Sequence, residues 1–241
     1  MAAADKTPIG SYHLAMLADI KIAHSVFALP FALLAAVMAA WPPEESGVAA
    51  VSNDVFVGAI VLIVVAMVTA RTAAMLSNRI LDRAIDARNP RTTSRPLASG
   101  AASLSNYVFV LAAVSVLFVG ITSGFWFLYG NPYPVILAVP VLAWICSYGL
   151  LKRFTSWCHV WLGISLAISV PAAAVAINPD AVLVEPSLWL LAGMVLCWVA
   201  GFDMIYALQD VTVDRAEGLH SMPSRLGVSG ALWLSCVLHV V

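Results

Sequence analysis

The sequence predicts an all-α protein that crosses a membrane repeatedly as a bundle of helices. Of its 241 residues, 62% are hydrophobic and only 10% are charged, and the mean hydropathy is +0.94. Soluble domains carry about 25% charged residues, so this composition lies far outside their range. Apolar runs of about 20 residues, enough to cross roughly 30 Å of hydrocarbon as helices, recur along the chain. A lipid bilayer is therefore the expected environment, and no nucleic-acid partner is expected.

Six apolar runs are predicted to form complete spans. In chain order they cover residues 22–41, 55–77, 105–129, 135–151, 157–177 and 188–208. The first is expected to stay as a helix rather than be cleaved as a signal peptide, because acidic residues lie in the segment before it. A seventh run, residues 231–241, would rise only about 17 Å at roughly 1.5 Å per residue. It is predicted to be a half-span, or the beginning of a span in a chain that is cut short.

The positive charges predict the orientation. Lysines and arginines precede the first run or follow the second, fourth and sixth, whereas the loops between carry only acidic charges. The positive-inside rule then places the N-terminus and the basic loops in the cytoplasm, as for a multi-pass protein of a bacterial-type inner (plasma) membrane. Arg71 is the exception, because it lies inside the second run, where a charge is costly and is usually retained for pairing or function.

The stretch "NRILDRAID" directly follows the second apolar run. Asn78, Asp82 and Asp86 are spaced four residues apart, so they share one face if the helix of the second run continues through them. One interpretation is a polar site at the cytoplasmic end of the span. The alternative is a solvated helix end in which Arg79 and Arg83 neutralise the two acids.

A second acidic stretch follows the sixth run. Tyr206, Asp210 and Asp214 repeat the same spacing, and Asp203 comes one turn earlier. Hard oxygen ligands that converge from two helices suit Mg²⁺, which completes its shell with waters and substrate phosphates. The pattern therefore predicts a Mg²⁺-bridged diphosphate beside an apolar bundle that suits an isoprenoid tail. The cations available to hold the phosphate oxygens are Lys152, Arg153, Arg71 and the loop arginines.

These stretches resemble the UbiA superfamily of intramembrane aromatic prenyltransferases. "NRILDRAID" is similar to the first aspartate motif of that family and "DVTVD" to the second. "RTTSRPLASG" is similar to the segment that follows the first motif, and "YGLLKR" to an element with tyrosine and lysine after the fourth span. The resemblance runs from about residue 21 to residue 227 and implies a ring of nine helices around one cavity. Residues 1–241 are accordingly expected to form a single UbiA-type domain that is incomplete at its C-terminus.

The resemblance also implies a mechanism with Mg²⁺ as cofactor and a polyprenyl diphosphate as donor. The implied Mg²⁺ ligands are Asn78, Asp82, Asp86, Asp210 and Asp214. Lys152, Arg71 and Tyr148 are expected to contact the diphosphate. Its departure would leave an allylic cation that an electron-rich ring captures at carbon. Tyr206 is expected either to stabilise this cation through its ring face or to be an ordinary interfacial tyrosine.

The acceptor is predicted from two further stretches. "KIAHSVFALPFALL" and "DRAEGLHSMPSRLG" resemble the 4-hydroxybenzoate polyprenyltransferase branch, with its relatives that prenylate a dihydroxynaphthoate for menaquinone as the alternative. Both acceptors are aromatic acids, so a cation at the acceptor pocket is expected. Lys21 or Arg71 can supply it, and His24 is a further candidate. Asp203 is expected to position the phenol or to accept its proton.

A transporter remains a functional alternative, because ionisable residues near membrane spans also mark ion pathways. The acids of this chain gather at one membrane face beside arginines, which favours a phosphate ester over a cation conduit. Haem, chlorophyll and ether-lipid prenyltransferases share the two motifs. The prediction is therefore a Mg²⁺-dependent prenyltransferase of quinone biosynthesis, for ubiquinone or alternatively menaquinone, with a polyprenyl diphosphate and an aromatic acid as substrates.

Overall fold

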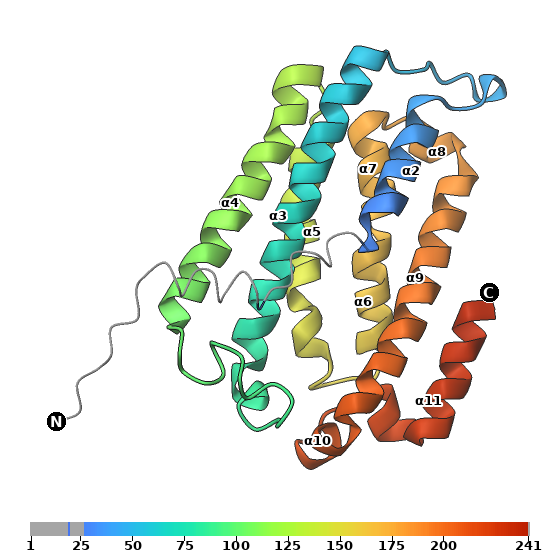
Figure 1. The fold of residues 1–241 in the computed structure, drawn as a ribbon. Helices are drawn as coiled ribbons and strands as arrows, with labels where there is room; N and C mark the ends of the chain where they lie inside the picture. The colour runs from blue at the N-terminus through green and yellow to red at the C-terminus, as the bar shows by residue number, and fades with distance from the viewer. Residues whose placement is uncertain (1–18, 20–26, 241) are drawn as a thin grey trace.

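The computed structural model describes Asp19 and residues 27–240, and every regular element in this part of the chain is a helix (Figure 1). The all-α prediction is confirmed. In chain order the elements are α2 (Leu29–Ala40), η2 (Glu44–Ser46), α3 (Asn53–Asp86), α4 (Leu104–Tyr129), α5 (Tyr133–Leu151), α6 (Cys158–Ala167), α7 (Ser169–Ile177), α8 (Ala181–Val184), α9 (Pro186–Ala207), η3 (Leu208–Asp210), α10 (Val211–Ala216) and α11 (Met222–Val240).

Five helical segments in the described residues are long and apolar enough to cross a membrane. They match the second to sixth predicted spans, with α6 and α7 together forming the fifth. The first predicted span, residues 22–41, is described only from residue 27 onward, where α2 is a shorter apolar helix. The protein is therefore a multi-pass membrane bundle.

Helix α3 is the longest element, with 34 residues, and it continues past the predicted end at Ser77 to Asp86. The hydrophobic pattern ends at Ser77, but the helix does not, because its last turns are buried against neighbouring segments. Asn78, Asp82 and Asp86 are all buried on it. The prediction that the first motif lies on one helix is confirmed.

The second motif is not on one continuous α-helix. Helix α9 ends at Ala207, a 3₁₀ turn covers Leu208–Asp210, and α10 begins at Val211. The chain then turns at Gly218, whose φ of 68° lies in the left-handed region that glycine adopts without steric cost. Asp210 therefore projects from a tight turn, whereas Asp214 lies on a short helix.

Small residues let the helices approach closely. Helix α2 packs on α7 through alanines that are fully buried, and α6 packs on α9. A Cβ added at Gly163 of α6 would lie 2.6 Å from the carbonyl oxygen of Leu196 and 3.2 Å from the Cβ of Ala200, both on α9. Such close approach is typical of membrane helix interfaces. It brings the polar ends of α6 and α9 together.

Helix α11 begins before the predicted apolar run at residues 231–241. Its non-helical residue Gly227, with φ 74° and ψ 175°, separates a first turn from the apolar part. The helix packs against α9 and starts at the end of the bundle where α10 lies (Figure 1). The loop after α3, the end of α5 and the segment from α9 to α11 thus share one end of the molecule.

Candidate active site

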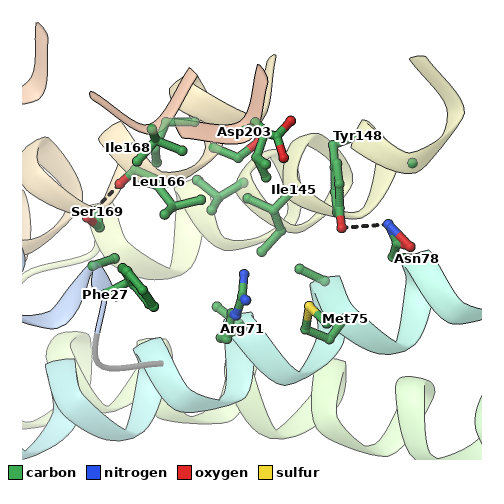
Figure 2. Close-up of a pocket in the computed structure, with 18 of the residues that line it drawn as sticks. Phe27, Arg71, Met75, Asn78, Ile145, Tyr148, Leu166, Ile168, Ser169 and Asp203 are labelled. Atoms are coloured by element: carbon green, nitrogen blue, oxygen red, sulfur yellow. Dashed lines mark hydrogen bonds between the residues drawn. The ribbon is translucent and has the colours of Figure 1, made fainter. Parts of the chain in front are cut away.

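A cavity of about 830 Å³ runs through the bundle and joins the two aspartate motifs. Helix α3 supplies one wall, and α5, α6 and α9 supply the facing walls (Figure 2). The predicted site residues that line it are Arg71, Asn78, Asp82, Asp86, Tyr148, Lys152, Asp203, Tyr206, Asp210 and Asp214. Residues as far apart as α3 and α10 therefore meet in one space.

The far part of the cavity is apolar. Its walls there carry no charge and come from α3, α4, α5, α6, α7 and α9. They include Ile63, Met67, Phe118, Phe125, Leu162 and Val199. Because the polar residues gather at the motif end, the cavity offers a charged mouth and a long hydrophobic chamber.

The first motif meets the end of α5. The Asn78 amide donates a hydrogen bond to the Tyr148 hydroxyl at 2.5 Å (Figure 2). Asp82 forms an ion pair with the Nζ atom of Lys152 at 3.1 Å. Tyr148 and Lys152 lie one helical turn apart, as do Asn78 and Asp82, so the two helices present matched rows of partners.

The loop after α3 supplies cations to both motifs. Arg95 pairs with Asp86 at 2.7 Å. Arg91 donates from Nε to Asp210 at 2.9 Å, and the amide of Asn89 donates to the same carboxylate oxygen at 2.8 Å. The hydrogen bond to Asp210 raises the pKa of Arg91. This loop therefore bridges the two motifs across the mouth.

An exposed ion pair joins the same loop to the segment after α10. Arg88 donates to both carboxylate oxygens of Glu217, at 2.6 and 2.5 Å. The hydrogen bonds from Arg88 lower the pKa of Glu217. Solvent-exposed pairs contribute little to stability, so the consequence of this contact is the relative placement of the two loops.

Three of the motif carboxylates, Asp82, Asp86 and Asp210, are paired with cations rather than grouped around a common point. Within the described part of the chain, no three acidic, histidine or cysteine side chains are arranged to hold a metal ion. The donor set nevertheless fits Mg²⁺, because it consists of carboxylate and amide oxygens. Asp82 also keeps one buried oxygen, Oδ1, without a hydrogen-bond donor. Nη2 of Arg153 lies 3.7 Å from that oxygen, close enough for an ion pair but not for a hydrogen bond, so Oδ1 can still accept a hydrogen bond or bind a metal ion.

Arg71 projects from α3 into the cavity, two helical turns deeper than Asn78 (Figure 2). Its Nε atom is buried and has no hydrogen-bond partner among the described residues. An unsatisfied buried donor is costly unless a ligand completes it. The position therefore favours an anionic group between the charged mouth and the apolar chamber.

Asp203 of α9 lies on the wall opposite Arg71 (Figure 2). One of its oxygens, Oδ2, is 2.7 Å from Nδ1 of His159 on α6. His159 was not among the predicted site residues. Its local sequence, "TSWCHVW", gave no signal for the pairing, because the partner lies on a helix far along the chain.

The guanidinium group of Arg91 lies over the ring face of Tyr206. The guanidinium carbon of Arg91 is 5.6 Å from the ring centroid, and Nη1 of Arg91 is 3.4 Å from the hydroxyl oxygen. The ring thus already makes a cation–π contact with a protein side chain. This contact holds Arg91 beside Asp210.

The remaining predicted site residues are either not on the cavity wall or outside the described part of the chain. Arg153 contacts Asp82 at 3.7 Å and the carbonyl of Leu81, but it is not part of the cavity wall. Lys21 and His24 lie outside the described residues. Arg79 does not neutralise the motif acids as the alternative interpretation required, because it pairs with Asp19 at 3.2 Å.

Comparisons with known proteins agree with this geometry. The UbiA prenyltransferase family matches residues 28–241. The 4-hydroxybenzoate octaprenyltransferase of Nitrosomonas eutropha is 32% identical over 176 residues, which are 72% of this chain and 59% of that protein. The chain thus spans about six tenths of the length of this curated relative.

Two solved structures share the fold. The apo structure of a UbiA homolog from Aeropyrum pernix K1 is 35% identical, with a TM-score of 0.77 over 91% of this chain and 76% of that one. A UbiA homolog from Archaeoglobus fulgidus, solved with DMAPP and Mg²⁺, is 17% identical, with a TM-score of 0.65 over 93% and 75% of the two chains. With both aspartate motifs placed on one cavity of this bundle, the chain belongs to the UbiA prenyltransferase family.

Proposed function

We propose that this protein transfers a polyprenyl group from an allylic diphosphate to a ring carbon of 4-hydroxybenzoate, a step of quinone biosynthesis. One observation carries the proposal. A single cavity joins a mouth of carboxylates and cations to an apolar chamber, and the buried guanidinium of Arg71 lies between them. The diphosphate suits the mouth, the prenyl chain suits the chamber, and the acid group of the acceptor suits Arg71.

The charged mouth can hold the diphosphate of the prenyl donor if Mg²⁺ replaces the cationic side chains that now pair with the motif carboxylates. Mg²⁺ would bind the carboxylate and amide oxygens of Asn78, Asp82, Asp86, Asp210 and Asp214, and when bound it would neutralise charge on the diphosphate. Lys152, Arg95 and Arg91 now pair with the motif acids. Released from them, these cations would donate charge-assisted hydrogen bonds to phosphate oxygens.

The transfer itself needs no covalent enzyme intermediate. The bond between the allylic carbon and the diphosphate oxygen breaks, and the electron pair leaves on the diphosphate. The ring carbon next to the hydroxyl group of the acceptor forms the new bond to the allylic carbon. Loss of the proton from that ring carbon restores the aromatic ring, and apolar walls such as Phe118 and Leu162 keep water from capturing the cation.

The acceptor would be held between two facing groups. Arg71 supplies a buried cation for the carboxylate, which would complete the unpaired Nε donor. Asp203 supplies a carboxylate on the opposite wall for the phenol hydroxyl (Figure 2). The curated relative from Nitrosomonas eutropha is named for the same acceptor, which supports this choice over a dihydroxynaphthoate.

The test is a transfer assay on purified protein in lipid nanodiscs with Mg²⁺ and radiolabelled polyprenyl diphosphates of several lengths. Acceptors are 4-hydroxybenzoate, a dihydroxynaphthoate and none. We expect prenylated 4-hydroxybenzoate only with Mg²⁺, and a loss of about 100-fold or more in Asp82→Ala and Asp210→Ala. Asn178→Ala, which removes a part-buried hydrogen bond to the carbonyl of Ala49 and changes no residue that lines the cavity, is the matched control. Folded wild-type protein that prenylates no aromatic acid would refute the proposal.

A further inference from the structure

His159 is a buried polar residue on the cavity wall that neither aspartate motif includes. Its side chain is 3% exposed, whereas that of its partner Asp203 is 28% exposed. Nδ1 of the ring lies 2.7 Å from Oδ2 of Asp203. The other ring nitrogen, Nε2, accepts a hydrogen bond from the backbone N–H of Met222 at 3.1 Å. Both nitrogens are therefore satisfied within the protein.

These two contacts define the tautomer of the ring. A backbone N–H can only donate, so Nε2 must be the unprotonated nitrogen of a neutral imidazole. The ring hydrogen is then on Nδ1 and is donated to Asp203. Because Oδ2 of Asp203 accepts this bond, the carboxylate is held in one orientation. No described residue donates to its other oxygen, Oδ1, which is left for a molecule in the cavity.

The His159 ring also cannot pass a proton from Asp203 to another group. A histidine that relays protons needs one nitrogen that can exchange with solvent or with a second titratable group. Here the second nitrogen faces a peptide N–H at the start of α11, which cannot accept a proton. His159 can orient Asp203 but cannot carry its proton away.

The packing of α6 against α9 fixes the distance between the pair. Gly163 lies one turn after His159 on the same face of α6, and its missing side chain lets α6 approach Leu196 and Ala200 of α9. Asp203 follows Ala200 by one turn. The contact to Met222 adds α11 to the same arrangement. Three helices therefore determine where the Asp203 carboxylate points.

We propose that His159 is a positioning residue that holds the Asp203 carboxylate directed at the phenol hydroxyl of the acceptor, without relaying a proton itself. The inference rests on the proposed function, because it assigns the acceptor to the space beside Asp203. His159 contacts none of the carboxylates assigned to Mg²⁺ by a hydrogen bond or ion pair in the described part of the chain. The ring interacts with one of those carboxylates, Asp214, only through space, so the main effect of replacing His159 should fall on the acceptor.

The kinetic test uses His159→Phe, which fills the space without a donor, and His159→Asn, whose amide can replace the Nδ1 hydrogen. We expect His159→Phe to lower kcat/KM for 4-hydroxybenzoate by at least about tenfold, with the KM for the polyprenyl diphosphate within twofold of wild type. His159→Asn should recover most of the loss. In an Asp203→Asn background, His159→Phe should cost little more, since residues that act through one another are not additive.

Two kinetic results would overturn the inference. One is a multiplicative loss when His159→Phe is combined with Asp203→Asn. The other is a rise in the KM for the diphosphate, which would place His159 with the motifs. Thermal unfolding of each variant, compared with Asn178→Ala, separates these results from a general loss of folding.

NMR spectroscopy tests the hydrogen bond between His159 and Asp203 independently of activity, even if wild-type protein prenylates no aromatic acid. In protein labelled with ¹⁵N-histidine, the signal missing from His159→Asn identifies His159. We expect a neutral ring protonated at Nδ1, with a shift that changes in Asp203→Asn. A ring protonated at Nε2, or one indifferent to Asp203→Asn, would contradict the proposal. Inactive wild-type protein with the expected signal would instead refute only the choice of acceptor.

Discussion

At the scale of single residues, the proposed aromatic-acid acceptor depends most on Arg71. It carries a full charge within a membrane span and keeps a buried donor without a partner. The cost of such a group is ordinarily offset by a ligand or by pairing. The motif acids already have Lys152, Arg91 and Arg95, so among the described cations of the cavity wall Arg71 remains available for a second anion.

Replacing this cation should therefore affect the acceptor and not the donor. In Arg71→Gln we expect the KM for 4-hydroxybenzoate to rise about 10-fold to 100-fold, as for the loss of a charge-assisted hydrogen bond. The KM for the polyprenyl diphosphate should stay within about twofold. Steady-state kinetics with each substrate varied in turn measures both values. The assignment of Arg71 to the acceptor would be wrong if the diphosphate KM rose and the acceptor KM did not.

At the scale of the helices, the close contact between α6 and α9 sets one wall of the site. Gly163 allows that contact because an added Cβ would lie 2.6 Å from the carbonyl oxygen of Leu196. Backbone atoms cannot move aside as a flexible side chain can, so the helices would have to separate. His159 and Asp203 lie on the same two helices and would separate with them.

Gly163→Ala should accordingly destabilise the protein by about 1–3 kcal/mol through overpacking. Gly193→Ala is the matched control on α9, because a Cβ there meets nothing within 4 Å. It should leave stability unchanged or raise it by up to about 1 kcal/mol, as the helix propensity of alanine predicts. Denaturation in a mixed detergent system measures both. Equal stability of the two variants would show that the α6–α9 contact can adapt.

The elements were predictable from the sequence to different degrees. The long apolar runs predicted the spans, and the four-residue spacing of the first motif predicted its helical face. The same spacing at Tyr206, Asp210 and Asp214 also predicted one helix, but α9 ends at Ala207. Spacing alone cannot locate that break, because the 3₁₀ turn of Leu208–Asp210 has no proline or glycine to mark it.

At the scale of the whole molecule, the cavity depends on contacts that no local pattern contains. The sequence predicted many of the acids and cations that line this cavity, since charged groups are unusual in an apolar chain. It did not predict which cation pairs with which acid. Asn89 reaches Asp210, and His159 reaches Asp203, only because the loop after α3 and helix α6 are folded against α9 and its continuation. Such pairs depend on tertiary packing.

The pairing of acids with cations predicts that Mg²⁺ and diphosphate bind cooperatively. Mg²⁺ alone must displace Lys152, Arg95 and Arg91 from the motif acids and leave them unpaired. A diphosphate alone would bring its charge close to those acids. When both ligands bind, Mg²⁺ neutralises the motif carboxylates and the diphosphate accepts hydrogen bonds from the displaced cations. The coupling is reciprocal, so each ligand should increase the affinity for the other by the same factor.

Calorimetric titration of the protein with Mg²⁺, with inorganic pyrophosphate and with each in the presence of the other measures this coupling. We expect at least about tenfold tighter binding of each ligand when the other is present, a coupling of about 1.4 kcal/mol or more. The coupling should be weaker in Asp86→Asn, because Arg95 would no longer be held by an ion pair. If Mg²⁺ and pyrophosphate bound independently, the proposal that they replace the ion pairs between the motif acids and the basic side chains would be wrong.

The most direct test of the account is the structure of the product formed from 4-hydroxybenzoate and a ¹³C-labelled polyprenyl diphosphate, determined by NMR. We expect a carbon–carbon bond at the ring position next to the hydroxyl group, because the acceptor carboxylate would be held at Arg71 and its phenol at Asp203, both of which line the cavity. An ether at the phenol oxygen, an ester at the carboxylate, or free polyprenol as the only product would contradict it.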